Sequence, residues 1–274
     1  MRICVAQTKS EKGNIKTNIE NHLRWIEHAV SAKADIIVFP ELSLTGYEPE
    51  LAEELATDQN DLRMDVFQEF SNTNEIVIGV GLPTKSEFGI LISMVLFQPN
   101  QPRETYSKQK LHLDEKPYFI EGTEQIIFKI KDKKIAPAIC YESLQPEHGE
   151  KVNEMGADLY LASVAKSQSG IEKAYTHFPK IAVKYSMPVL MANCIGFCDN
   201  FQGAGQTSVW DENGILIGQL NSQSEGIIIY DTVTKSTIRA KNTNPNNAKK
   251  NNVKGSESID LGVFAKSPNR KNIA

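Results

Sequence analysis

The sequence lacks the features that mark several common classes of protein. No apolar run approaches the roughly 18 residues that a membrane-spanning helix needs, so we expect no membrane segment. The net charge is only −4, and the basic residues are spread along the chain without a stripe that could hold nucleic acid. The residues that follow Met1 lack the apolar stretch of a secretion signal. These absences favour a protein that acts on a small molecule, without nucleic-acid or membrane partners.

Cysteine is also scarce, with four residues in a chain of 274. So few cysteines at this length do not suggest a disulfide framework, and without a secretion signal we expect the reducing cytoplasm. Cys194 and Cys198 form a C-x3-C pair, but no second pair or matched histidines accompany them. We therefore expect no metal site and no cofactor.

Apolar runs continue to about residue 230 without an intervening linker, which predicts a single domain over residues 1–231. A hydrophobic content of 40% is enough to bury a substantial core. Residues 241–255 are rich in Asn and Lys and nearly free of apolar side chains, so they cannot bury enough surface to order themselves. We expect residues 232–274 to be a polar tail, partly flexible or docked on a neighbouring subunit through an apolar cluster at 259–264.

The spacing of apolar residues predicts alternating strands and helices in this domain. Amphipathic helices are expected near residues 14–32, 62–70, 145–155 and 170–185. Strands are expected at 3–7, 35–38, 76–80, 90–97, 125–130, 134–139, 189–192, 207–210 and 225–230. This order of elements favours two sheets flanked by helices.

Cys140 stands where an apolar strand gives way to the polar residues Tyr141-Glu142-Ser143. A thiol at the end of a buried strand is held rigidly and faces a cleft, as a nucleophile requires. A single cysteine is more often a small core residue, so the assignment depends on two further segments. Glu41 follows another apolar strand, and Lys110 lies in a third segment. A base, a cation and a thiol are together the parts of an acyl-transfer site.

Three segments together resemble the Glu-Lys-Cys signature of the nitrilase (carbon-nitrogen hydrolase) superfamily. They are Phe39 to Tyr47, Lys110 to Leu113 and Ile139 to Glu142, and their order also matches. Other stretches that fit the same order are 115–122, 156–158, Asn193 and 205–207, followed by Asp211 and Gly214. The resemblance covers residues 1 to about 231, and it implies an α/β fold built as a four-layer αββα sandwich.

The chemistry of a thiol suggests a role for each residue of this signature. A thiol with a pKa of about 8.5 is mostly protonated at neutral pH, so Glu41 would take its proton. Lys110 and the backbone N–H of Tyr141 are candidates for stabilising the oxyanion that forms. The resemblance implies that Glu115 orients the lysine. Departure of the amine would leave a thioester on Cys140, which water activated by Glu41 would hydrolyse.

Four further residues are candidates for substrate binding. Tyr47, Tyr141 and Ser163 are either pocket walls or ordinary core and loop residues. Glu142 either orients the site or makes a structural hydrogen bond. His112 resembles the histidine in the family's lysine motif, although a packed or surface histidine is the simpler interpretation.

The leading hypothesis is an amidase-type hydrolase of a small linear amide or N-carbamoyl compound. Tyr141 follows the nucleophile where the nitrile-cleaving branch typically has Cys-Trp-Glu. Hydrolysis of a small nitrile is the alternative reaction, and a non-catalytic binding protein on the same fold is the alternative class. Lys166 and Lys173 could meet a substrate carboxylate, although we expect both to be exposed to solvent.

The resemblance also predicts a homodimer or a larger even homo-oligomer. The expected helix at 170–185 carries more apolar residues than one core-facing stripe needs, and large exposed patches usually mark contacts. Those residues are Ile171, Ala174, Phe178, Ile181 and Val183. The alternative is a helix that is wholly buried in a monomer.

Overall fold

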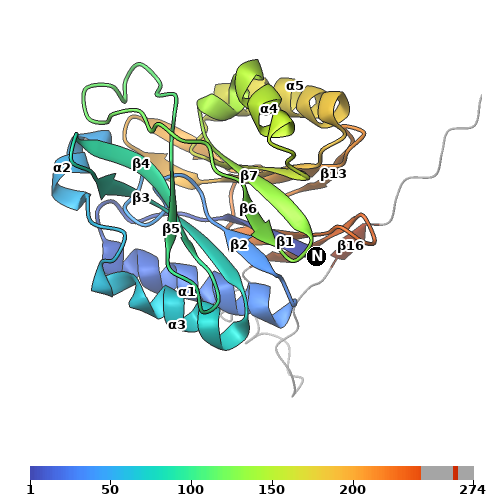
Figure 1. Cartoon of the computed structure of the whole chain (residues 1–274), viewed down its shortest axis with the longest axis horizontal. Helices are drawn as coiled ribbons and strands as arrows, with labels where there is room; N and C mark the ends of the chain where they lie inside the picture. Colours follow the sequence, from blue (N-terminus) through green and yellow to red (C-terminus); the bar gives the residue numbers. More distant parts are fainter. Residues whose placement is uncertain (242–261, 265–274) are drawn as a thin grey trace, which may run out of the picture.

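Two β-sheets form the centre of the molecule (Figure 1), in a computed structural model that describes residues 1–241 and 262–264. The first sheet has the strand order β16-β15-β14-β1-β2-β3-β4-β5, and the second has the order β13-β12-β9-β8-β7-β6. A separate hairpin joins β10 and β11.

The strands of the first sheet have the following bounds: β1 Arg2–Gln7, β2 Ile36–Val38, β3 Val77–Lys85, β4 Ile90–Phe97, β5 Glu104–Ser107, β14 Gly226–Asp231, β15 Ser236–Lys241 and β16 Gly262–Phe264. The second sheet contains β6 Phe128–Ile130, β7 Lys133–Ile139, β8 Leu159–Val164, β9 Val189–Asn193, β12 Ser208–Trp210 and β13 Leu216–Gln219. The hairpin strands are β10 Ile195–Cys198 and β11 Phe201–Ala204.

Helices cover the outer face of each sheet. Helices α1 (Ile15–Ser31) and α3 (Asp65–Asn74) lie on the first sheet, and α4 (Pro146–Glu154) and α5 (Gln168–Tyr185) lie on the second (Figure 1). The short helices are α2 (Ala52–Leu55) and the 3₁₀ turns η1 (Pro49–Leu51), η2 (Leu62–Met64) and η3 (Glu142–Leu144). The four-layer αββα sandwich expected from the sequence is therefore confirmed.

Local sequence explains why the first layers form. Asn14 caps α1, since its side chain accepts a hydrogen bond from the Thr17 N–H at 3.1 Å. Trp25 and Ile26 lie on the buried face of this helix and pack on the first sheet. Strand β2 then runs parallel to β1, because α1 returns the chain to the end of the sheet at which β1 begins.

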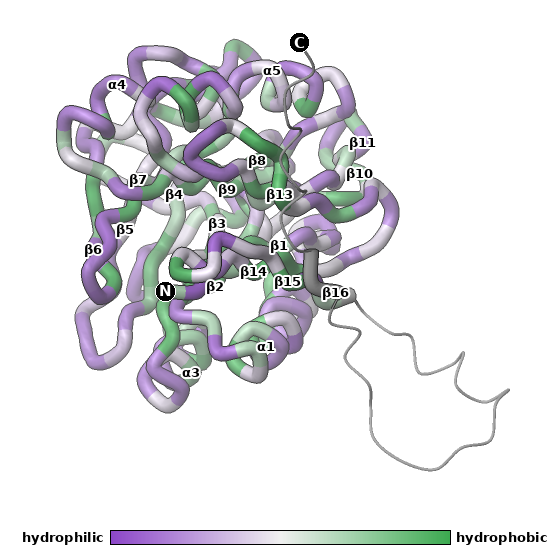
Figure 2. The backbone as a smooth tube through the Cα atoms, turned by 90° about the vertical axis from the view of Figure 1, so that its right-hand side faces the viewer, coloured by the Kyte–Doolittle hydropathy of each residue, from purple (hydrophilic) through white to green (hydrophobic). Residues whose placement is uncertain are grey.

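Three apolar layers hold the sandwich together. The central layer lies between the sheets and includes Val38 from β2 and Ile139 from β7. The other two layers lie between each sheet and its helices. Hydrophobic positions concentrate along the strands in the middle of the molecule, whereas the outer loops are mostly hydrophilic (Figure 2). This packing brings the carboxyl ends of β2 and β7 into one region.

The first sheet continues beyond the predicted end of the domain at residue 231. Strand β15 pairs antiparallel with β14 along its whole length, and β16 pairs with β15. The domain boundary at 231 stays a prediction, although the sheet already includes residues 236–241. Ile259 and Leu261 of the predicted docking cluster lie outside the described residues.

The apolar residues of α5 do not form an exposed patch. Ile171, Phe178 and Ile181 are buried, and they belong to the layer between this helix and the second sheet. Val183 is the exception, at 58% exposed. The expectation of an exposed apolar face on this helix is therefore wrong, because helical spacing turns most of these side chains toward the chain's own sheet. The homodimer stays a prediction without support from this helix.

None of the described helices is both long enough and apolar enough to cross a membrane. The cytoplasmic location stays a prediction.

Candidate active site

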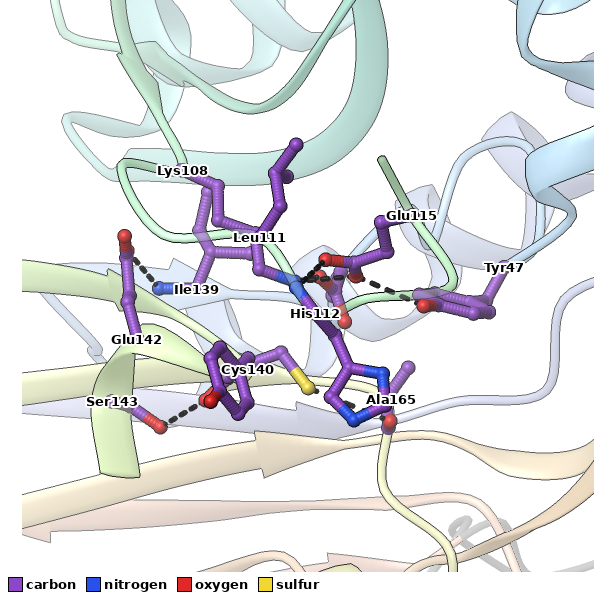
Figure 3. Close-up of polar contacts among 12 residues, drawn as sticks. Tyr47, Lys108, Leu111, His112, Glu115, Ile139, Cys140, Glu142, Ser143 and Ala165 are labelled. Atoms are coloured by element: carbon purple, nitrogen blue, oxygen red, sulfur yellow. Dashed lines mark hydrogen bonds and ion pairs between the residues drawn. The ribbon is translucent and has the colours of Figure 1, made fainter. Parts of the chain in front are cut away.

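Three strand ends place the central residues of the site. Glu41 follows β2, Lys108 follows β5, and Cys140 follows β7. Glu41 and Lys108 are buried, and Cys140 is half-buried. Figure 3 shows Lys108 and Glu115 pointing toward each other, with the sulfur of Cys140 below them. The fold therefore brings together a thiol, two carboxylates and an ammonium group.

The lysine of this cluster is Lys108. Its Nζ donates to Oε1 of Glu41 at 2.7 Å and to Oε1 of Glu115 at 2.6 Å, and the side chain is 0% exposed. Lys110, the lysine predicted from the sequence, is exposed to solvent. The predicted site lysine, Lys110, is therefore corrected to Lys108.

The backbone explains this correction. The N–H of Lys108 still donates to the Ile92 carbonyl of β4 at 2.9 Å, and its carbonyl accepts from the Gly122 N–H at 2.7 Å. Strand β5 ends at Ser107, and the chain bends at residues 109–110. Lys108 is therefore held at the sheet edge, whereas Lys110 lies beyond the bend. Strand alternation does not separate the two lysines, because residues 106, 108 and 110 would all lie on one face of an extended chain.

Glu115 holds the lysine in place. Its Oε1 accepts hydrogen bonds from Lys108 Nζ and from the Tyr47 hydroxyl at 2.9 Å, and its Oε2 accepts from the His112 N–H at 2.7 Å. Three donors on one buried carboxylate fix its position. This geometry agrees with the orienting role that the resemblance implies for Glu115.

Burial and charge act against each other on these groups. Burial raises the pKa of Glu41, the Lys108 charge lowers it, and the Glu115 charge raises it, with a net increase. Burial lowers the pKa of Lys108, but the charges of Glu41 and Glu115 outweigh it and raise that pKa overall. The lysine therefore stays an ammonium group, and Glu41 is a stronger base than an exposed carboxylate.

Cys140 adopts a left-handed backbone conformation, with φ of 46°. This region is uncommon for a residue with a side chain, and such strain clusters at functional sites. The conformation is held by hydrogen bonds, since the Cys140 N–H donates to the Ser163 carbonyl at 3.0 Å. The Cys140 carbonyl accepts from the Ser143 N–H at 3.2 Å and from the Ser143 hydroxyl at 2.5 Å. The turn thus presents the thiol in one direction.

The thiol of Cys140 is protonated at neutral pH in the resting site. Burial and the charge of Glu41 raise its pKa, the charges of Lys166 and Lys108 lower it, and the net result is a pKa of about 11. Its Sγ lies 3.6 Å from the Ala165 carbonyl oxygen (Figure 3). A thiol with this pKa needs a base before it can attack a carbonyl carbon.

A cavity of about 590 Å³ opens beside Cys140. Tyr47 and Tyr141 lie in its wall, as do His112 and Glu115. The other lining residues come from α5, its preceding loop, the turn after β7 and the β10–β11 hairpin; they include Leu144, Gln145, Ala165, Lys166, Ser169, Lys173, His177, Asn200 and Phe201. Lys166 and Lys173 were already candidates from the sequence for meeting a substrate carboxylate, whereas the β10–β11 hairpin was not assigned to the site, because only the fold brings it there.

Ser163 and Glu142, both predicted to bind substrate, do not line this cavity. The Ser163 hydroxyl donates to the Phe39 carbonyl at 2.8 Å, so it connects the two sheets. The Oε1 of Glu142 accepts from the Tyr106 hydroxyl and the Ile139 N–H, both at 2.6 Å. Both residues act within the protein core, and their predicted contact with substrate is corrected.

Glu142 connects the lysine segment to the cysteine strand. Its Oε2 accepts from the Gln109 N–H at 2.6 Å, next to Lys108, while its Oε1 bonds the end of β7. Burial raises the pKa of Glu142 to about 7, although the hydrogen bonds from Tyr106, Ile139 and Gln109 lower it. Glu142 therefore sets the position of Lys108 relative to Cys140.

Lys166, expected to be exposed, is instead buried at 4% exposed, and it lines the cavity. Its Nζ lies 3.4 Å from the Cys140 carbonyl oxygen and 3.8 Å from Cys140 Sγ. Lys173 is exposed at the cavity rim, as expected. The two lysines thus occupy different electrostatic environments.

Two curated relatives illustrate the range of proteins that this chain is similar to. It is 26% identical over 251 residues to a glutamine-dependent NAD(+) synthetase of Aquifex aeolicus, in a match that covers 88% of this chain and 43% of the relative. It is also 23% identical to the 2-oxoglutaramate amidase of Bacillus subtilis, covering 79% of this chain and 84% of the relative. The chain thus spans less than half the length of the synthetase.

Solved structures of the amidase from Nesterenkonia sp. AN1 have the same fold, with a TM-score of 0.77 at 19% identity, covering 84% of this chain and 89% of that one. One of them holds butyramide, and in another the acetamide moiety of fluoroacetamide is covalently added at the active-site cysteine. The sequence profile of the family described as carbon-nitrogen hydrolase matches residues 2–242. The chain therefore belongs to the carbon-nitrogen hydrolase family.

Proposed function

We propose that this protein is an amidase-type hydrolase that cleaves the carbon–nitrogen bond of a small linear amide or N-carbamoyl compound through a thioester on Cys140. One observation carries the proposal: the Cys140 thiol faces a cavity of about 590 Å³ beside the Glu41-Lys108-Glu115 cluster. A cavity of this size accommodates a small molecule rather than a protein chain.

Acylation begins with the thiol proton. Glu41, whose pKa burial raises, takes this proton as Cys140 Sγ attacks the carbonyl carbon of the amide. An ammonium group has three N–H donors, and two of those on Lys108 bond Glu41 and Glu115. The third donor and the Tyr141 backbone N–H then stabilise the oxyanion. Glu41 returns its proton to the departing ammonia or amine, which leaves a thioester on Cys140.

Deacylation repeats these steps with water. Glu41 accepts a proton from the water as it attacks the thioester carbonyl, and the same donors stabilise the second oxyanion. Collapse of this intermediate breaks the C–S bond, and the thiolate regains its proton from Glu41. The products are a carboxylic acid and the regenerated thiol.

The curated relatives support terminal amides as the first substrates to test. Glutamine, in the name of the synthetase, and 2-oxoglutaramate, in the name of the amidase, both carry a primary amide at the end of a short carbon chain. In a compound of this shape, the amide can reach the Cys140 thiol while the other end of the molecule lies near α5 and the loop that precedes it. We therefore place the terminal amide at Cys140.

Nitrile hydrolysis is the second candidate within the same chemistry. A thiolate can attack a nitrile carbon, but the resulting thioimidate must take up water before nitrogen leaves. The Cys140-Tyr141-Glu142 sequence, where the nitrile-cleaving branch typically has Cys-Trp-Glu, favours the amide. A binding protein without activity is disfavoured because thiol, base and ammonium group all lie at one site.

The test is a product screen with the purified full chain. Ammonia release and liquid chromatography would be measured with L-glutamine, 2-oxoglutaramate, butyramide, an N-carbamoyl amine and an aliphatic nitrile. We expect acid and ammonia or amine from at least one amide or carbamoyl compound and none from the nitrile. The Cys140→Ala variant should keep its circular dichroism spectrum and lose all turnover.

A quenched reaction would locate the intermediate. We expect intact-mass spectrometry to detect an acyl adduct and peptide mapping to assign it to the Cys140 peptide. An adduct on Cys4, Cys194 or Cys198 would contradict the proposal, as would acid production by the Cys140→Ala variant at a tenth or more of the normal rate. Acid production from the nitrile alone would favour the second candidate.

An even homo-oligomer remains part of this proposal because of the family resemblance. Light scattering at micromolar concentration should give a mass of two chains or a larger even number. A mass near that of one 30.5 kDa chain, unchanged on concentration, would reject it.

A further inference from the structure

Glu41, Lys108 and Glu115 alone do not balance the charge of a thiolate. In their ionised forms these residues carry two negative charges and one positive charge, and all three are buried. Transfer of the Cys140 proton to Glu41 moves the unpaired negative charge of this cluster onto the sulfur, where Lys108 and Glu115 already pair with each other. Removing an unpaired charge from water costs several kcal/mol. A second cation beside the sulfur would remove this obstacle.

Lys166 supplies a cation at the required place. Its Nζ is 3.8 Å from Cys140 Sγ and 3.4 Å from the Cys140 carbonyl oxygen. Among residues 1–240, whose side chains the structure describes, no ion pair joins Lys166 to a carboxylate. Its charge is therefore directed at the cysteine rather than at a glutamate or aspartate.

The backbone of Lys166 is held rigidly. Its N–H donates to Oδ1 of the buried Asn193 at 2.8 Å. Its carbonyl accepts from Asn193 Nδ2 at 3.2 Å and from the Ala204 N–H at 2.9 Å. Three hydrogen bonds around one residue fix the direction in which its side chain leaves the loop.

Gly170 of α5 leaves room for the side chain of Lys166. A Cβ added at Gly170 would lie 3.1 Å from Lys166 Cβ and 3.3 Å from its Cγ. These separations are shorter than ordinary contacts, so a side chain at position 170 would compete with the lysine stem. The glycine therefore lets the aliphatic part of Lys166 run along the helix toward Cys140.

We propose that Lys166 is a further catalytic residue, which pairs with the Cys140 thiolate while Glu41 holds the proton. The S–H bond of Cys140 breaks and an O–H bond forms on Glu41, so the proton stays within the site and the net charge of the site does not change. Afterwards Lys108 pairs with Glu115, and Lys166 pairs with the thiolate. The five groups sum to zero charge before and after the transfer. The proposal depends on the proposed function only in taking Cys140 as the nucleophile.

Every ionisable group that faces the thiol fits this account. Burial raises the pKa of Cys140, Glu41 and Glu115 raise it further, and Lys166 and Lys108 lower it. Two neighbouring groups have a raised pKa and stay uncharged at neutral pH: Tyr47, mainly because of burial, and Cys194, because of its hydrogen bond with Cys198 and then burial. The charge of a Cys140 thiolate raises both pKa values further. The other ionisable side chains of the cavity wall are those of His112, Asp114, Tyr141, Lys173 and His177.

Alkylation by iodoacetamide tests the proposal without any substrate. The reagent is neutral and reacts with the thiolate, so its rate against pH follows thiol ionisation. The full chain would be treated from about pH 7 to about pH 10, and modification of the Cys140 peptide would be measured by mass spectrometry. An opposite charge at this range lowers a pKa by about 1–3 units. We expect Lys166→Met to slow alkylation at neutral pH about tenfold or more and to move the profile to higher pH.

Two matched variants make the result specific. Lys166→Arg keeps the charge and should restore much of the normal profile. Lys173→Met removes an exposed charge from the same cavity wall, where water screens it, and should leave the alkylation profile in place. Circular dichroism and thermal melting of each variant would show that it is folded.

The proposal is overturned if folded Lys166→Met has the wild-type alkylation profile, or if Lys173→Met shifts the profile equally. It is also overturned if Lys166→Met raises only the KM for carboxylate-bearing amides, because the lysine would then bind substrate instead. A shifted profile without hydrolysis of any tested amide would support the role of Lys166 and reject the proposed function.

Discussion

Ser163 of β8 donates its hydroxyl hydrogen to the backbone carbonyl of Phe39, 2.8 Å away, and so bonds one sheet directly to the other. Phe39 comes two residues before Glu41, and the Ser163 carbonyl accepts the N–H of Cys140. One serine therefore connects the chain segment of the base to that of the nucleophile.

Ser163→Ala should destabilise the fold and lower activity together. The substitution leaves a buried carbonyl without its donor, which costs about 1–3 kcal/mol. Denaturant unfolding should show this loss, and turnover should fall because the spacing of Glu41 and Cys140 relaxes. Ser31→Ala on the exposed face of α1 is the matched control, expected within about 0.5 kcal/mol of wild type. A Ser163→Ala variant as stable as this control would show that the bond is unimportant.

Lys108→Met and Lys110→Met should differ sharply. Loss of Lys108 leaves two buried carboxylates uncompensated, so we expect destabilisation of about 3–5 kcal/mol and a rate reduced at least about 10²-fold. Lys110 is exposed, and its replacement should change neither quantity appreciably. Unfolding curves and single-turnover rates of both variants would measure this. Loss of turnover in Lys110→Met with normal turnover in Lys108→Met would restore the original assignment.

Glu41→Gln should slow both halves of the reaction. Glutamine keeps the size of the side chain but cannot accept a proton, and a general base contributes about 10²–10⁴-fold. Single-turnover acylation and hydrolysis of the isolated thioester should both fall by factors in this range. If either step kept its wild-type rate, Glu41 would not be its base. Glu54→Gln, on an exposed part of α2, is a control of the same chemistry and should react normally.

His22 should make stability depend on pH. Burial lowers the pKa of this histidine to about 4, although its hydrogen bond with the Asn18 carbonyl raises it. Between about pH 6.5 and pH 4 the unfolded chain binds a proton that the folded chain does not, so stability falls as pH falls. Relative to His22→Gln, wild type should lose about 2 kcal/mol between pH 7 and pH 5.

Unfolding measured for both proteins at the two pH values isolates this contribution, since the other titrating groups are shared. Equal losses in wild type and His22→Gln would mean that folding does not lower the pKa of this histidine.

Local sequence determined the layered fold and two of the central site residues. Glu41 and Cys140 each follow a run of apolar residues, and a strand that ends in a turn delivers the next polar side chain to the sheet edge. Because this relationship lies within a few residues, it could be predicted without knowing the packing. The amphipathic spacing of α1 and α5 is local in the same way.

Only the tertiary structure decided which lysines belong to the site. Lys108 and Lys110 are two lysines of one polar segment, and the sequence does not distinguish them. Lys108 is buried because the Ile92 carbonyl of β4 holds its backbone, whereas the bend at residues 109–110 turns Lys110 into solvent. Lys166 resembles a surface lysine in sequence, but Asn193 and Gly170 bury it beside Cys140. The charge that a side chain meets depends on residues far along the chain, so electrostatics follows from packing rather than from local pattern.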